Sequence, residues 1–148
     1  MSRKSSKISA VIESYQGYGL TPHYLAYFEC FNRQLFFEAH EVLEELWLPQ
    51  RSGPKGGFYK GLIQLAGAFV HLQKKRPGPA ASLLRLAQVN LGQYPATYES
   101  LEVVAVQLMI SKWLASIEQG LVGLDRPPQL QPPKLFVNAR HTGLESSL

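Results

Sequence analysis

Several polar side chains of two predicted helices could together hold a metal ion or a small polar ligand. On a helix predicted over residues 36–48, His40, Glu44 and Trp47 share one face at about 100° per residue. The other acidic residues of this helix share a second face, which we expect to be solvated: Glu38, Glu41 and Glu45. Glu44 lies instead in an aromatic stripe, so we expect it to be buried beside His40.

A second helix, predicted over residues 57–75, is apolar around most of its circumference, which indicates a central position. One narrow strip of it is polar or small, and Gln64 and His71 are stacked there two turns apart. Lys60 lies near the entrance of this strip. Unpaired polar groups are costly to bury, so the strip is expected to face His40 and Glu44 on the preceding helix. The predicted site lies between the two helices.

This arrangement is compatible with a metal site. His40 and Glu44 at positions i and i+4 can ligate one ion, and His71 would be the third protein ligand. Gln64, Lys60, Trp47 and Glu41 are the groups that could contact a ligand or support the metal ligands. Three protein ligands with one open position characterise catalytic sites, so we consider a metal-dependent hydrolase that uses zinc, manganese or iron.

Two well-known metal patterns are not matched. Glu44 stands where a His-Glu-x-x-His motif has its second histidine, and each helix carries one histidine where paired Glu-x-x-His motifs would be needed. Three alternatives therefore remain: a metal-free pocket for a small polar ligand, walled by Phe36, Trp47 and Tyr59; a buried network that only fixes packing; and partner binding through the C-terminal tail. The sequence does not decide whether the protein is an enzyme.

The elements that would position these residues predict an all-α fold. Five helices with short connections form a single-domain bundle over residues 21–124, preceded by a flexible leader (1–20) and followed by an extended, Pro-rich tail (125–148). In the tail, Leu130, Leu135 and Phe136 are expected to contact the bundle. The five helices are predicted at 21–34, 36–48, 57–75, 80–93 and 100–119. A homo-oligomer could form through the Val/Leu face of the last helix.

Composition excludes several classes of protein. The 148 residues are 45% hydrophobic and 18% charged, as in a globular domain. No apolar run has the length of a membrane span and no secretory signal is recognised, so a cytoplasmic location is expected. The single cysteine, Cys30, is interpreted as a buried hydrophobic residue. The net charge of +4 is scattered rather than gathered in a stripe, so there is no strong signal for nucleic-acid binding.

The chain also resembles a bacterial and archaeal family, the domain of unknown function 309. The family's His-x-x-x-Glu-x-x-Trp pattern is matched by His40, Glu44 and Trp47, and the segment 60–71 resembles its Gly-Leu-Ile-Gln…His helix. With the fourth helix, the resemblance covers about residues 25–95. It implies an all-helical fold and a suspected metal site, but no activity. The chain departs from the family at Arg76-Pro-Gly-Pro79, where relatives usually have a Gly-Asn turn.

Overall fold

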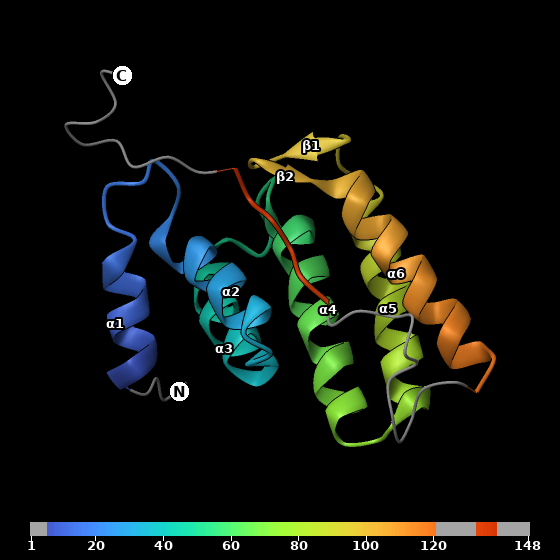
Figure 1. Cartoon of the computed structure of the whole chain (residues 1–148). Coiled ribbons are helices and arrows are strands. Elements are labelled where there is room, and N and C mark those ends of the chain that lie inside the picture. The colour runs from blue at the N-terminus through green and yellow to red at the C-terminus, as the bar shows by residue number, and fades with distance from the viewer. Residues whose placement is uncertain (1–5, 121–132, 139–148) are drawn as a thin grey trace.

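The structure is a computed structural model that describes residues 6–120 and 133–138. Within these residues the chain is mostly helical, as the sequence predicts (Figure 1). The six α-helices are α1 (Ser6–Ser14), α2 (Pro22–Asn32), α3 (Phe36–Trp47), α4 (Gly56–Gln73), α5 (Pro77–Leu91) and α6 (Val103–Glu118). A single 3₁₀ turn, Leu48–Gln50, follows α3.

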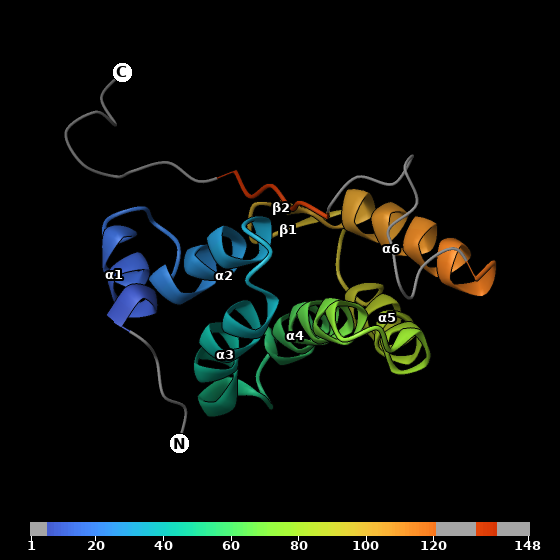
Figure 2. The same cartoon turned by 60° about the horizontal axis from the view of Figure 1, so that its bottom comes forward.

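The helices form two layers. Figures 1 and 2 show α3, α4 and α5 side by side in one layer, with α2 and α6 on the same face of it. Residues 133–138 run between α2 and α6. The central helix α4 carries the core between the layers, since Phe69 contacts the rings of Phe31 on α2 and Trp113 on α6 at 5.7 and 5.0 Å. The polar strip of α4 lies on its opposite side and therefore faces away from α2 and α6.

Proline marks the beginnings of two helices. Pro22 is the first residue of α2, as expected from its fixed φ and missing N–H. Pro77 is likewise the first residue of α5. The predicted start of this helix at Ala80 is wrong, because Pro77 and Pro79 both lie in the first turn, where no intrahelical N–H bond is lost.

A small β-ribbon, which the sequence analysis did not predict, joins α5 to α6. Strands β1 (Thr97–Tyr98) and β2 (Leu101–Glu102) pair antiparallel around the turn residues Glu99 and Ser100. Both turn residues have positive φ, 49° and 61°, as a two-residue hairpin turn of type I′ requires. Lys55 Nζ lies 3.3 Å from Glu99 Oε1 and so connects this turn to the beginning of α4.

The described part of the tail is extended and held against the bundle. Leu135 is buried as predicted, whereas Phe136 is 77% exposed, so its predicted contact with the core is absent. The third predicted contact, Leu130, lies outside the described residues. Asn32 Nδ2 donates to the Leu135 carbonyl and Asn32 Oδ1 accepts from the Leu135 N–H, each over 2.7 Å. Val137 forms an isolated bridge with Leu101. The predicted boundary at 124/125 and the last ten residues lie outside the described part.

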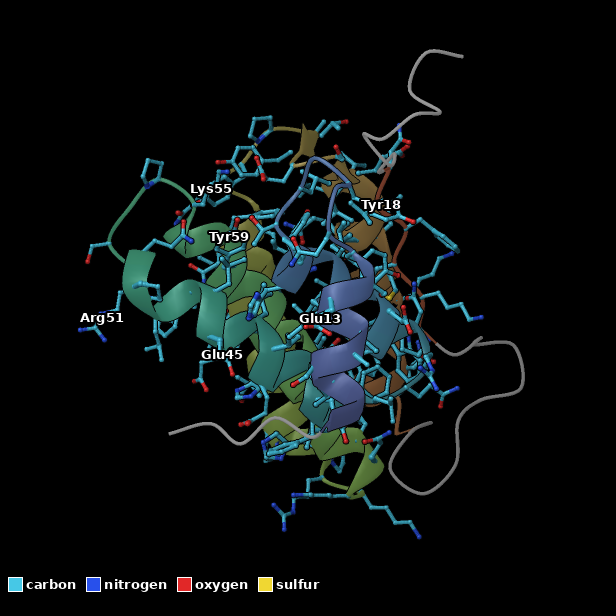
Figure 3. The ribbon with its side chains drawn as sticks, turned by 90° about the vertical axis from the view of Figure 1, so that its left-hand side faces the viewer. Glu13, Tyr18, Glu45, Arg51, Lys55 and Tyr59 are labelled. Carbon is cyan, nitrogen blue, oxygen red and sulfur yellow. The ribbon has the colours of Figure 1, made fainter. Side chains whose placement is uncertain are left out.

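The expectation of a flexible leader over residues 1–20 is wrong for residues 6–14, which form α1. Ile8 and Ile12, one turn apart, are buried in the core, so the helix is held by its apolar stripe. Figure 3 shows α1 in front of α2, with Glu13 on the helix and Tyr18 in the loop after it. Among the described residues, no helix is both long and apolar enough to cross a membrane.

Candidate metal centre and adjoining pocket

Three potential metal ligands lie together on α3. One ligand atom each of His40, Glu41 and Glu44 falls within 4.8 Å of the other two, and all three side chains are half-buried. Helix geometry explains the grouping. His40 and Glu44 are one turn apart, and Glu41 is three residues before Glu44, so both spacings bring side chains to the same side of the helix.

The donor set fits a divalent transition metal. One imidazole nitrogen and two carboxylate oxygens are ligands that zinc, manganese and iron accept. Tetrahedral bonds of about 2.1 Å place neighbouring ligand atoms about 3.4 Å apart. The ligand atoms lie within 4.8 Å of one another, so their separations have to shorten by at most about 1.4 Å, which rotation of two glutamate side chains provides.

A pocket of about 340 Å³ adjoins His40 on the face of the layer turned away from α2 and α6. Helix α4 supplies its floor, with Gly67 leaving space above the helix. Phe37 and His40 of α3 form one wall and Leu83 of α5 the other. The remaining lining residues all come from α4 and its end: Ile63, Gln64, Val70, His71 and Lys74. The pocket therefore combines apolar walls with a few polar groups, as small-ligand sites commonly do.

Buried ring nitrogens without hydrogen-bond partners gather around this region. In the part of the chain that the structure describes, four buried side-chain polar atoms lack a partner, and three of them are His40 Nδ1, Trp47 Nε1 and His71 Nδ1. An unpaired buried polar atom costs about 1–3 kcal/mol. Such atoms are commonly satisfied by a water, an ion or a ligand. His40 and His71 both line the pocket, so their imidazole rings are within reach of a ligand there.

The predicted ligand set is only partly brought together. His40 and Glu44 are grouped as predicted, but the third member of the group is Glu41 rather than His71. His71 lies on α4 and lines the adjoining pocket together with His40. Glu41 was predicted on a separate acidic face because the direction in which a side chain leaves the helix does not include its length. A glutamate is long enough to bring its carboxylate back toward its neighbours.

Gln64 has a different partner from the one predicted. Asn90 Nδ2 of α5 donates to Gln64 Oε1 over 2.7 Å. Among the described residues, no hydrogen bond joins His40, Glu44, Gln64 and His71 to one another. The hypothesis of a self-satisfied network among these four residues is therefore not supported.

The polar cluster is also less buried than predicted. His40, Glu44, Gln64 and His71 are all half-buried. The strip of α4 faces away from α2 and α6, and α5 packs against it at Gly61 and Gln64. Glu45, expected on a solvated face, is half-buried and lies 3.2 Å from His23 Nε2 of α2.

The other predicted site residues lie outside the pocket lining. Lys60 is exposed and outside the pocket lining, and Trp47 is half-buried at the end of α3. Phe36 and Tyr59, the predicted walls together with Trp47, are buried in the core. Figure 3 shows Tyr59 one turn after Lys55 at the beginning of α4 and Arg51 extending away from the body.

Sequence reasoning missed Phe37, Lys74 and Leu83 as pocket residues. Phe37 carried no signal in the sequence, because its 56% exposure is seen only in the folded chain and single exposed hydrophobic residues are common. Lys74 follows the last turn of α4, where a cation is common because it complements the helix dipole, so its type and position did not indicate a pocket. The position of Leu83 depends on how α5 packs against α4, which no local pattern of the sequence indicates.

Comparison with known proteins agrees with the resemblance to this family. Residues 24–83 match the model of a family described as Domain of unknown function (DUF309), a segment that contains both His40 and His71. An uncharacterized protein of Aquifex aeolicus (strain VF5) is 25% identical over 96 residues, which are 65% of this chain and 27% of that protein. The chain thus matches about a quarter of that relative's length. No solved structure matches the chain significantly.

Proposed function

We propose that this protein binds one divalent metal ion through His40, Glu41 and Glu44 and holds a small polar ligand beside it. The observation that carries the proposal is the approach of these three ligand atoms to within 4.8 Å of one another. Three protein ligands leave at least one coordination position for water or a ligand. A metal-bound water is acidic enough to supply hydroxide near neutral pH, so hydrolysis is the reaction class that we would screen.

Metal content tests this proposal directly. Tag-free protein is incubated with zinc, manganese or iron(II), separated from free metal, and measured by plasma mass spectrometry. We expect close to one ion per chain in the wild type. His40→Ala and Glu44→Gln should each lose most of it, since each removes one of three ligands. Glu38→Gln is the matched control, because Glu38 lies on the same helix outside the group and the charge change is the same.

His71→Ala distinguishes between two ligand sets: the proposed set, His40, Glu41 and Glu44, and the set predicted from the sequence, in which His71 is the third ligand. If Glu41 is the third ligand, Glu41→Gln lowers metal content and His71→Ala leaves it nearly unchanged. The reverse result would restore the sequence-based ligand set. Wild-type protein that takes up no metal would refute the metal site itself.

A metal-free ligand pocket is the second candidate, and the unpaired Nδ1 atoms of His40 and His71 favour it. Both residues line the 340 Å³ pocket, so a polar ligand could satisfy these atoms without any ion. A thermal-shift screen of small polar compounds, run with a chelator present, tests this candidate. A hit that His71→Ala abolishes would support it.

A further inference from the structure

The charges around the pocket indicate what kind of ligand it accepts. No acidic residue lines it, whereas its polar lining consists of His40, Gln64, His71 and Lys74. Lys75 and Arg76 follow Lys74 directly and are exposed, so they add positive potential beside it. Glu41 and Glu44, which are grouped with His40 on α3, lie outside the lining.

The apolar part of the lining indicates the body of the ligand. Phe37, Ile63, Val70 and Leu83 surround the space above Gly67. The Phe37 ring is 56% exposed and lies nearly parallel to the His40 ring, with centroids 6.3 Å apart. A compact apolar group in the pocket would cover the Phe37 ring and remove its surface from water, which is favourable.

From these two features we infer that the pocket binds a small organic anion, a carboxylate or phosphate ester with a compact apolar body. Its anionic oxygens lie near His71 and Lys74, and its body contacts Phe37 and Leu83. This inference rests on the proposed function in one respect. The ion neutralises Glu41 and Glu44, which would otherwise repel an anion, so metal and anion should each strengthen the binding of the other.

Titration calorimetry on the full chain tests the inference with phenyl phosphate and benzoate as probes and phenol as the neutral control. With manganese-loaded protein, we expect at least one of the two anions to bind and phenol to bind much more weakly. Lys74→Gln should weaken anion binding about tenfold, the usual cost of a lost hydrogen bond to a charged group. Lys75→Gln, with the same charge change outside the pocket lining, should weaken it much less than Lys74→Gln.

The outcomes separate this inference from the metal site. Metal binding without anion binding, or phenol binding as tightly as the anions, overturns the inference and leaves the proposed function intact. If Lys74→Gln and Lys75→Gln weaken anion binding equally, the inference is also overturned. The anion would then be attracted by the overall positive charge of this surface and not by a contact with Lys74. If no metal binds, the same titration is made on the metal-free protein. Anion binding that depends on Lys74 then supports the pocket while the metal proposal fails, and no anion binding overturns both.

Discussion

Gln64 of α4 and Asn90 of α5 are joined by a hydrogen bond in which Asn90 Nδ2 donates to Gln64 Oε1 over 2.7 Å. Both side chains are half-buried where the two helices pack. This hydrogen bond fixes α5 beside α4. Because Leu83 also lies on α5, the bond helps to position Leu83 as a wall of the pocket. Gln64 thus links the packing of the layer to the shape of the candidate site.

A double-mutant cycle tests this link. Asn90→Ala and Gln64→Ala should each lower the free energy of unfolding by about 1 kcal/mol, the usual net value of a hydrogen bond. The double variant should lose less than the sum, because the second change removes a bond that is already broken. Urea unfolding of the four proteins measures these values. Strictly additive losses would show that the bond contributes nothing.

Two glycines of α4 should respond differently to substitution by alanine. A Cβ at Gly61 would lie 2.9 Å from Leu91 Cγ and 3.0 Å from its Cδ2, whereas one at Gly67 would meet only Leu83 Cδ1, at 3.3 Å. Gly61→Ala should therefore force α4 and α5 apart and cost about 1–3 kcal/mol. Gly67→Ala should be near neutral, because a small shift of Leu83 and the better helix propensity of alanine offset each other.

Thermal unfolding of both variants checks this difference. A Gly61→Ala variant as stable as the wild type would contradict the close packing of α4 on α5. Gly67→Ala also places a methyl group in the floor of the pocket. It should therefore weaken binding of the anion probes without destabilising the fold, and metal content provides the control.

The helices around the site were predictable because their signals are local. The apolar periodicity of α3 and α4 and the prolines near their ends fix both elements within a few residues. The β-ribbon was not predictable in this way, because its turn is Glu99-Ser100 and not the Asn-Gly that usually marks a type I′ turn. The short helix α1 was missed because its two buried residues, Ile8 and Ile12, are too few to show a period.

The site was predictable only as far as single helices determine it. Helix geometry brings His40 and Glu44 together, and the structure confirms their proximity. The partner of Gln64 depends on where α5 lies. The exposure of His71 depends on which side of α4 the second layer covers. Both are properties of the tertiary packing and have no signature in the periodicity of one segment.

Alkaline pH should destabilise the protein through Tyr59. Burial, and after it the negative charge of Glu99, raises the pKa of Tyr59 from 10.0 to about 12. The folded state thus favours the neutral phenol. The stabilisation from this preference is complete below pH 10, the pKa in the unfolded chain, and is lost as the pH rises toward 12. Tyr59 should account for up to about 2 kcal/mol of this loss.

Urea unfolding at several pH values between 8 and 12 measures the effect, with Tyr59→Phe as the comparison. The wild type should lose more stability over this range than the variant, whatever the stability of the two at pH 8. Tyr24 and Tyr27, whose pKa values burial also raises, remain in both proteins and contribute equally. Parallel pH profiles of wild type and Tyr59→Phe would show that Tyr59 ionises as readily in the folded as in the unfolded chain.

The paired hydrogen bonds between Asn32 and Leu135 should control how firmly residues 133–138 are held. Asn32→Ala removes both 2.7 Å bonds at once and leaves the Leu135 N–H and C=O without their partner. We expect the Leu135 amide hydrogen to exchange about tenfold or more faster, since losing one bond of about 1.4 kcal/mol already changes an opening equilibrium tenfold. Hydrogen exchange followed by mass spectrometry or NMR measures the rate.

The matched control is Phe136→Ala, since Phe136 is 77% exposed and neighbours Leu135 in the same segment. This variant should leave the exchange of the Leu135 amide unchanged. The bridge between Leu101 and Val137 and the bond from Asn138 N–H to the Ser100 carbonyl hold the far end of the segment independently of Asn32. Faster exchange in Asn32→Ala should therefore be concentrated at Leu135 and weaker at Asn138. Equal acceleration at both positions would mean that the segment detaches as one unit, and unchanged exchange at Leu135 would mean that Asn32 does not hold it.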